Sequence, residues 1–280
     1  MDDYKNKLIE KYTEAFSKTE NKPEWAVKKK SNINELIHPP IPFIGDNYNE
    51  KKVLLYASAE NLTHYINSDK ETEYYENDNE AIDRHSLFYE LYKDKENYFF
   101  PYVHIAPVNN GALLNIAGYI LHKMFNSNFN NPYQLVKNLA IANFGKFSIN
   151  TKTNKDYASN FKYLKFSFEF VKADLEILKP EIIIIPRSIY YKSKKIIKEI
   201  VPAAKILPIY QITGCTINCS IHRKYKEKEK SLLPGWLVKW HENLPTFPEK
   251  YRISGKTKNN FYSVYSYLDE FKILNDKKNN

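Results

Sequence analysis

The sequence predicts an α/β fold, a three-layer α/β/α sandwich around a central, mostly parallel sheet of four strands. Short apolar runs alternate with helical patterns along the chain, which is typical of parallel βαβ units. The strand candidates are largely apolar, as expected for a parallel sheet that helices cover on both faces. Apolar residues make up 42% of the 280 residues, which is enough for a large core.

An amphipathic helix is the first element expected. Leu8, Ile9, Tyr12 and Phe16 recur at helical spacing within residues 2–18, so one side of this helix is apolar. Further helical patterns cover residues 111–125, 163–178 and 192–200.

Four apolar runs predict the strands of the sheet. The third run is the clearest, because four consecutive isoleucines lie between Glu181 and Pro186. The expected strands are residues 53–57, 139–143, 181–186 and 205–210.

Three consecutive parts are expected along the chain. We expect residues 1–38 to form an N-terminal helical extension and residues 39–225 to form the α/β domain. Residues 226–280 are basic and aromatic, and we expect them to form a C-terminal extension packed on the core.

The net charge bears on the partner. It is +9, with a pI near 9.1, and this favours a polyanion such as nucleic acid. A general lysine-rich bias of the source genome would give the same charge, so both interpretations stay open.

Cysteine content and hydropathy bear on cofactors and compartment. Cys215 and Cys219 are too few for a disulfide framework or an iron–sulfur cluster. Their spacing could suit a metal with help from His222, but two free thiols are the preferred interpretation, and no cofactor or metal is expected. No apolar run reaches 18 residues, and the N-terminus lacks a signal-peptide core. We therefore expect a cytoplasmic protein without a membrane partner.

Polar residues follow the first strand directly. In "KKVLLYASAENLTHYINSD" the apolar run ends in small residues and then presents Glu60 and Asn61 side by side. Ligands bind at the carboxyl ends of the strands in open parallel sheets. A surface turn is the simpler alternative for such a strand end.

Four features in chain order carry a resemblance to a known family. They are the loop Ala57–Asn61, the strand end "IANFGKFS", the strand entry "LEILKPEIIIIPRS" and the loop "LPIYQITGCTINC". This layout resembles the uracil-DNA glycosylase superfamily over roughly residues 40–225. The resemblance implies a DNA glycosylase that flips a base out of DNA and excises it without a metal or redox cofactor.

Two loops depart from that family and bear on the substrate. The first loop lacks the family's Gly and Pro, and the last loop reads Tyr210-Gln211-Ile212-Thr213 where the family usually has H-P-S. These departures favour a base other than uracil, such as a bulky modified pyrimidine. Because the superfamily includes bacterial enzymes that remove glucosylated hydroxymethylcytosine from phage DNA, a role in phage defence is one hypothesis.

The resemblance also implies roles for particular residues. Cleavage of the glycosidic bond builds positive charge on the sugar and negative charge on the departing base. Glu60, supported by Asn61, would stabilise the sugar cation or align water. Asn143 would read the base edge, since an amide offers a donor and an acceptor, and Tyr210 and Gln211 would contact the leaving base. For Asn143, capping of the turn after its strand is the alternative.

DNA contacts are expected from a hydrophobic wedge and from basic residues. Ile217 would fill the gap that a flipped base leaves. The residues expected to hold phosphates are Lys146, Arg187, Arg223 and Lys224. Asp83 and His85 form a further acid–base candidate. The alternative function is an inactive DNA- or protein-binding module on the same fold.

Overall fold

A computed structural model gives the arrangement of the chain. It describes residues 2–18, 28–29, 32–36, 38–59, 74–75, 77–86, 111–147, 164–210, 220–243 and 262–275. Their contacts form two compact units that interleave along the sequence. The described parts of Met1–Lys93 and Lys137–Pro208 belong to the first unit, and those of Asn110–Val136 and Ile209–Asn280 belong to the second.

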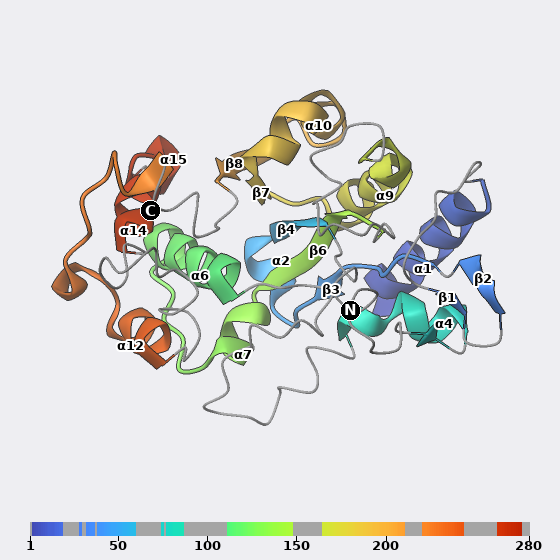
Figure 1. The fold of residues 1–280 in the computed structure, drawn as a ribbon, viewed down its shortest axis with the longest axis horizontal. Helices are drawn as coiled ribbons and strands as arrows, with labels where there is room; N and C mark the ends of the chain where they lie inside the picture. The colour runs from blue at the N-terminus through green and yellow to red at the C-terminus, as the bar shows by residue number, and fades with distance from the viewer. Residues whose placement is uncertain are drawn as a thin grey trace. The chain divides into compact units, whose positions relative to one another are not determined.

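The first unit is built on a five-stranded sheet (Figure 1). In sheet order the strands are β3 (Phe43–Ile44), β6 (Leu139–Gly145), β4 (Val53–Ala59), β7 (Ile182–Pro186) and β8 (Lys205–Ile209). All four strands predicted from the sequence lie in this one sheet, so the α/β class is confirmed.

The sheet differs from the prediction in strand number, and the added strand is antiparallel. It has a fifth strand, β3, which pairs antiparallel with β6 through Phe43↔Ile141. The sheet is therefore mixed and five-stranded. Strand β3 has two residues, which is too short a run for an alternating or apolar pattern to reveal.

Strand β4 lies between two parallel neighbours. It pairs with β6 from Val53↔Leu139 to Ala59↔Gly145, and with β7 from Val53↔Ile182 to Leu55↔Ile184. Every residue of β6 and β7 is buried. Apolar and β-branched side chains such as those of β7 fit a pleated surface covered on both faces.

One face of the sheet packs against helices α1 (Asp2–Ser17) and α9 (Phe168–Leu178). Alternate residues of β4, among them Leu54 and Tyr56, join a single core cluster with Leu8 of α1 and Phe170 of α9. The predicted apolar side of the first helix is thus confirmed: Leu8 and Tyr12 are fully buried.

The entry to β7 is shaped by a helix stop. Helix α9 ends at Leu178, and Lys179 takes a left-handed conformation (φ 47°) with its N–H bonded to the carbonyl of Leu175. Pro180 follows and cannot continue the helix. The chain then enters β7, which explains why the motif "LKPEIIII" joins a helix directly to a strand.

Smaller elements complete the first unit. Helix α10 (Arg187–Ile200) follows β7 without a loop and starts five residues before the predicted helix. Short helices α2 (Tyr48–Lys51) and α4 (Asp78–Ile82) flank the strands. The sequence did not predict a second sheet of three strands, β2 (Asn32–Leu36), β1 (Lys28–Lys29) and β5 (Tyr74–Tyr75).

The second unit is helical. Its elements are α6 (Gly111–Phe125), α7 (Pro132–Val136), α12 (Gly235–Asn243), α14 (Tyr262–Asp269) and α15 (Lys272–Asn275). The long apolar helix predicted at residues 111–125 is confirmed as α6. Within the described ranges no helix has both the length and the apolar character needed to cross a bilayer.

A polar cluster links α6 to α14 inside the second unit. Tyr119 donates a hydrogen bond to Asp269 at 2.6 Å, and Lys228 donates to the same carboxylate. Burial of the Asp269 carboxyl raises its pKa, but the hydrogen bonds from Lys228 and Tyr119 outweigh burial and hold the pKa below its ordinary value. This carboxylate therefore stays charged and holds the two helices together above about pH 4.

His85 should make the first unit sensitive to acid. Its ring is 1% exposed, and burial, Arg84 and Lys146 lower its pKa well below 6.5. Because the unfolded chain then takes up a proton first as the pH falls, stability present above pH 6.5 is lost below it. The neighbouring Asp83 pairs with Lys5 at 2.6 Å, and the acid–base role of Asp83 and His85 stays a prediction.

We expect the free energy of unfolding to fall by about 1.4 kcal/mol per pH unit from this proton alone as the pH drops below 6.5. In denaturant unfolding, the free energy of unfolding of His85→Gln should depend less steeply on pH, by the contribution of one proton. His222→Gln changes an exposed side chain and serves as the control. An unchanged slope in His85→Gln would mean that this imidazole is protonated in the folded protein.

Candidate functional site

The carboxyl ends of β4, β6 and β7 meet at one edge of the sheet, because these strands run parallel. The chain passes from β4 to β6 on one side and later returns to β7 on the other side of β4. The connections therefore leave this edge in opposite directions. Such a switch point opens a crevice at the carboxyl ends of the strands, where ligands of open α/β sheets bind.

The predicted catalytic pair follows directly from this edge. Glu60 and Asn61 come after Ala59, the last residue of β4, and they lie outside the described residues. The predicted residues Gln211 and Ile217 also lie outside them. Their roles remain predictions that rest on their position in the sequence.

A polar group of β4 is enclosed at the same edge. Ser58 is the residue before the end of the strand, and its hydroxyl oxygen is buried without a hydrogen-bond partner among the residues that the structure describes. A buried hydroxyl ordinarily has a partner. The carboxyl end of β4 therefore offers a hydroxyl that no described residue engages.

Asn143 lies in β6 opposite Ala57 of β4. Its side chain is 1% exposed, and it points to the opposite side of the sheet from its neighbours Ala142 and Phe144, which belong to the core cluster beneath α1 and α9. The structure thus places its amide inside the protein, two residues before the end of β6. Its reading of a base edge stays a prediction.

Tyr210 follows β8 and is half-buried in the second unit. Its ring packs on Tyr267 of α14, with the centroids 5.1 Å apart. The convergence of Tyr210 with Glu60 and Asn143 stays a prediction, because Glu60 lies outside the described residues.

Three of the four basic residues predicted to hold phosphates are exposed. Arg187 is the first residue of α10 and lies over the ring of Tyr191 at 5.3 Å. Arg223 and Lys224 are exposed in the turn after Ile221, which belongs to the second unit. These side chains are accessible to an anionic partner.

The prediction for Lys146 is wrong. This lysine is 1% exposed, and its ammonium bonds the Asp174 carboxylate at 2.6 Å inside the core. A side chain enclosed in this way does not reach a phosphate. The charge of Lys146 and its place after a strand are evident from the sequence, but its burial depends on Asp174, which lies 28 residues further along the chain.

Lys146 belongs to a buried polar cluster that sequence reasoning missed. Asp174 also accepts hydrogen bonds from Tyr12 at 2.6 Å and from Tyr56 at 3.0 Å. Burial raises the pKa of the Asp174 carboxyl, while the Lys146 ammonium and the two hydroxyls act in the opposite direction. Both tyrosine pKa values are raised by burial and by Asp174. The cluster joins α1, β4 and α9 to the residue that follows β6.

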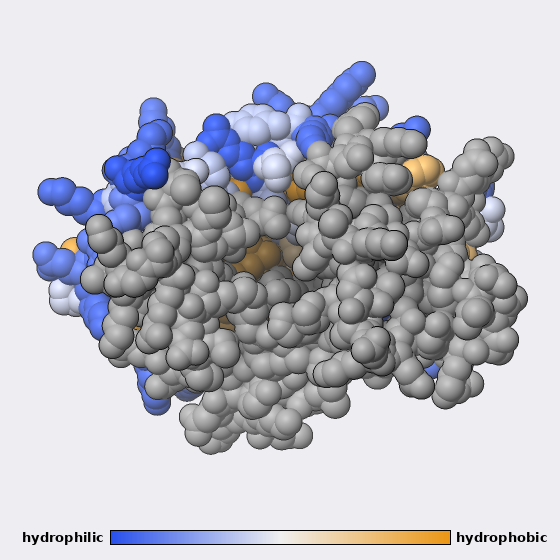
Figure 2. Space-filling view, in the orientation of Figure 1, coloured by the Kyte–Doolittle hydropathy of each residue, from blue (hydrophilic) through white to orange (hydrophobic). Residues whose placement is uncertain are grey.

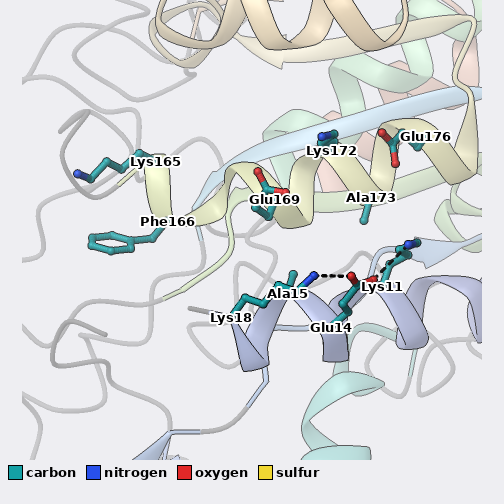
Figure 3. A pocket seen from close by; sticks show the side chains of 10 residues that line it. All are labelled: Lys11, Glu14, Ala15, Lys18, Lys165, Phe166, Glu169, Lys172, Ala173 and Glu176. Atoms are coloured by element: carbon teal, nitrogen blue, oxygen red, sulfur yellow. Dashed lines mark hydrogen bonds and ion pairs between the residues drawn. The ribbon is translucent and has the colours of Figure 1, made fainter. Parts of the chain in front are cut away.

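A groove of about 410 Å³ runs between α1 and α9 (Figure 3). It is lined mainly by charged residues of both signs, with Lys165 and Lys172 among them. Glu14 pairs with Lys11 at 3.2 Å and with Lys18 at 2.5 Å. Four lysines and three glutamates line the groove, so its charges nearly cancel, and we assign it no ligand.

Comparison with known proteins adds no relative. No family model, curated sequence or solved structure matches the chain.

Proposed function

We propose that the protein is a DNA glycosylase of the uracil-DNA glycosylase superfamily that flips and excises a modified pyrimidine. The observation that carries the proposal is the switch point at β4, with β6 and β7 as parallel neighbours on its two sides. The predicted acid Glu60 follows the strand at this point. The proposal includes a three-layer arrangement, with helices on both faces of the mostly parallel part of the sheet.

The proposed reaction is hydrolysis of an N-glycosidic bond. The bond between the sugar carbon and the base nitrogen breaks, the oxygen of water joins the sugar carbon, and a proton goes to the departing base. The Glu60 carboxylate would align this water or stabilise the positive charge on the sugar. Asn143, Tyr210 and Gln211 would donate hydrogen bonds to the base, which stabilises its negative charge.

The proposed substrate is a pyrimidine larger than uracil. The first loop has neither the Gly nor the Pro of the uracil enzymes, and the last loop has no His-Pro-Ser. A glucosylated hydroxymethylcytosine in phage DNA is the specific candidate, and phage defence in the cytoplasm is the corresponding role.

The test is a panel of duplexes that carry uracil, hydroxymethylcytosine or glucosylated hydroxymethylcytosine at one position. We expect abasic sites to form in the duplex with a bulky modified base and not in the uracil duplex. Cleavage of the uracil duplex alone would remove the proposed substrate class. DNA binding without abasic sites on any duplex would favour the second candidate, an inactive DNA- or protein-binding module.

A further inference from the structure

The outer side of α10 concentrates positive charge in the sheet-containing unit. Five basic residues and one acidic residue give this helix a net charge of +4, nearly half of the +9 of the chain. In contrast, α1 has three lysines against four carboxylates, and α9 has one lysine against three. A uniform bias toward lysine would not single out one helix.

The charges of α10 form one stripe. At 100° per residue, Arg187, Tyr191, Lys194 and Lys198 lie above one another along the helix, and all four are exposed. Lys195 borders the stripe and is exposed as well. The stripe is about 16 Å long, which equals the axial length of about five base pairs.

Three lysines of this helix lack an ion-pair partner within the described part of the chain. Lys194, Lys195 and Lys198 form no ion pair with any residue that the structure describes, whereas Lys7, Lys11 and Lys18 of the α1 region each pair with a carboxylate. In Figure 2 hydrophilic side chains project along the upper edge of the view, where Figure 1 shows α10. An extended anion would neutralise this surface.

The other side of α10 decides between two anionic partners. Ile189 and Ile197 are fully buried in the core cluster, and Tyr190 is 9% exposed. A helix that binds a lipid surface inserts its apolar side among the acyl chains. Because the apolar side of α10 is committed to the core, its charged side fits a polyanion in solution better than a bilayer.

An exposed aromatic ring favours nucleic acid among such polyanions. Tyr191 is 61% exposed, which is unusual for a large aromatic ring, and Arg187 lies over it at 5.3 Å. Aromatic rings and guanidinium groups stack on the bases of unpaired nucleotides. The pair lies in the first turn of α10, directly after the carboxyl end of β7.

We infer that the exposed side of α10 is the DNA-docking surface, with its lysines on phosphates and Tyr191 on an unpaired base near the carboxyl edge of the sheet. This inference rests on the proposed function for the identity of the polymer. Its test needs no modified base, because phosphate contacts are independent of sequence.

The experiment measures the salt dependence of binding to an unmodified duplex of about 20 base pairs, long enough to cover the stripe several times over. In the full-length chain, K194Q/K195Q/K198Q should make the slope of log affinity against log salt concentration shallower by about two to three. Each lost phosphate contact removes about 0.9 from this slope. The control K165Q/K172Q/K205Q removes three exposed lysines elsewhere in the same unit and should leave the slope nearly unchanged. Thermal unfolding checks that both variants fold.

A second comparison tests Tyr191 on the corresponding single strand. Tyr191→Ala should weaken binding by about fivefold or more, and Tyr191→Phe should keep it, because only the ring stacks. Equal flattening by both lysine variants would overturn the inference, since charge alone would then explain binding. The inference would also be overturned if the native chain bound phosphatidylserine vesicles but not DNA, and if the α10 variant alone lost this vesicle binding. If the slopes change as expected but no abasic sites form in the substrate panel, the DNA-docking surface is supported and the glycosylase activity is rejected.

Discussion

Replacing Lys146 by methionine is expected to lower the free energy of unfolding by about 3 to 5 kcal/mol, because it leaves a buried carboxylate without a countercharge. Asp174 is fully buried and accepts three hydrogen bonds, from Lys146, Tyr12 and Tyr56. Two neutral hydroxyls do not replace an ammonium at 2.6 Å. Since whole domains are stable by only about 5 to 15 kcal/mol, this loss is a large fraction of the total.

Urea unfolding of a small set of variants tests this expectation. Asp174→Asn should cost a similar amount by leaving the ammonium unpaired. The double variant K146M/D174L should recover only part of the loss, because neither charge is then buried but the Tyr12 and Tyr56 hydroxyls lose their acceptor. Lys7→Met breaks an exposed pair with Asp3 and should cost less than about 1 kcal/mol. A loss below 1 kcal/mol in Lys146→Met would show that Asp174 is protonated in the folded protein.

The buried pair has a consequence for the proposed site. Lys146 follows β6 directly, its backbone N–H bonds Ser167 at 2.8 Å, and its side chain is fixed on α9. The carboxyl end of β6 is therefore held at two points, three residues after Asn143. A fixed strand end is what a base-reading amide requires, since a displacement of about 1 Å is enough to impair catalysis.

The second large effect is expected from Glu60→Gln. A carboxylate that aligns water or stabilises the sugar cation contributes roughly 100-fold or more to the rate. Glutamine keeps the size of the side chain and removes its charge, so turnover should fall by that factor while DNA affinity stays within about threefold, because phosphate contacts carry most of the affinity.

Glu50→Gln provides the matched control. Glu50 is an exposed acid in α2, ten residues before Glu60, and its removal changes the net charge by the same amount. The single-turnover rate of Glu50→Gln should equal that of the native chain, and the rate of Glu60→Gln should be lower by roughly 100-fold or more. Equal rates would show that Glu60 is a surface acid of a strand end.

The strands were predictable because their signal is local. Each is a short apolar run, and the four isoleucines of β7 suit only a buried strand or helix. The order of the strands is not local, since β4 lies between β6 and β7 only in the folded sheet. The sequence therefore predicted which residues follow strands, and the fold supplied the switch point.

Burial and charge neutralisation explain the errors. The sequence shows that Lys146 is basic, but not that Tyr12, Tyr56 and Asp174 enclose it, because these residues lie on three other elements. The stripe of α10 had a signal in "RSIYYKSKKIIKEI", where basic residues and one tyrosine recur at helical spacing. It was missed because the predicted helix began at Lys192, so that Arg187 and Tyr191 were left out of it.

The release of a free base tests the central claim most directly. A duplex with one glucosylated hydroxymethylcytosine, incubated with excess protein, is analysed for the free base by mass spectrometry and for abasic sites in the DNA. The account predicts both products in equal amounts with the native chain, and neither at a comparable rate with Glu60→Gln. Tight binding of this duplex with no released base and no abasic site would contradict it and leave a DNA-binding module.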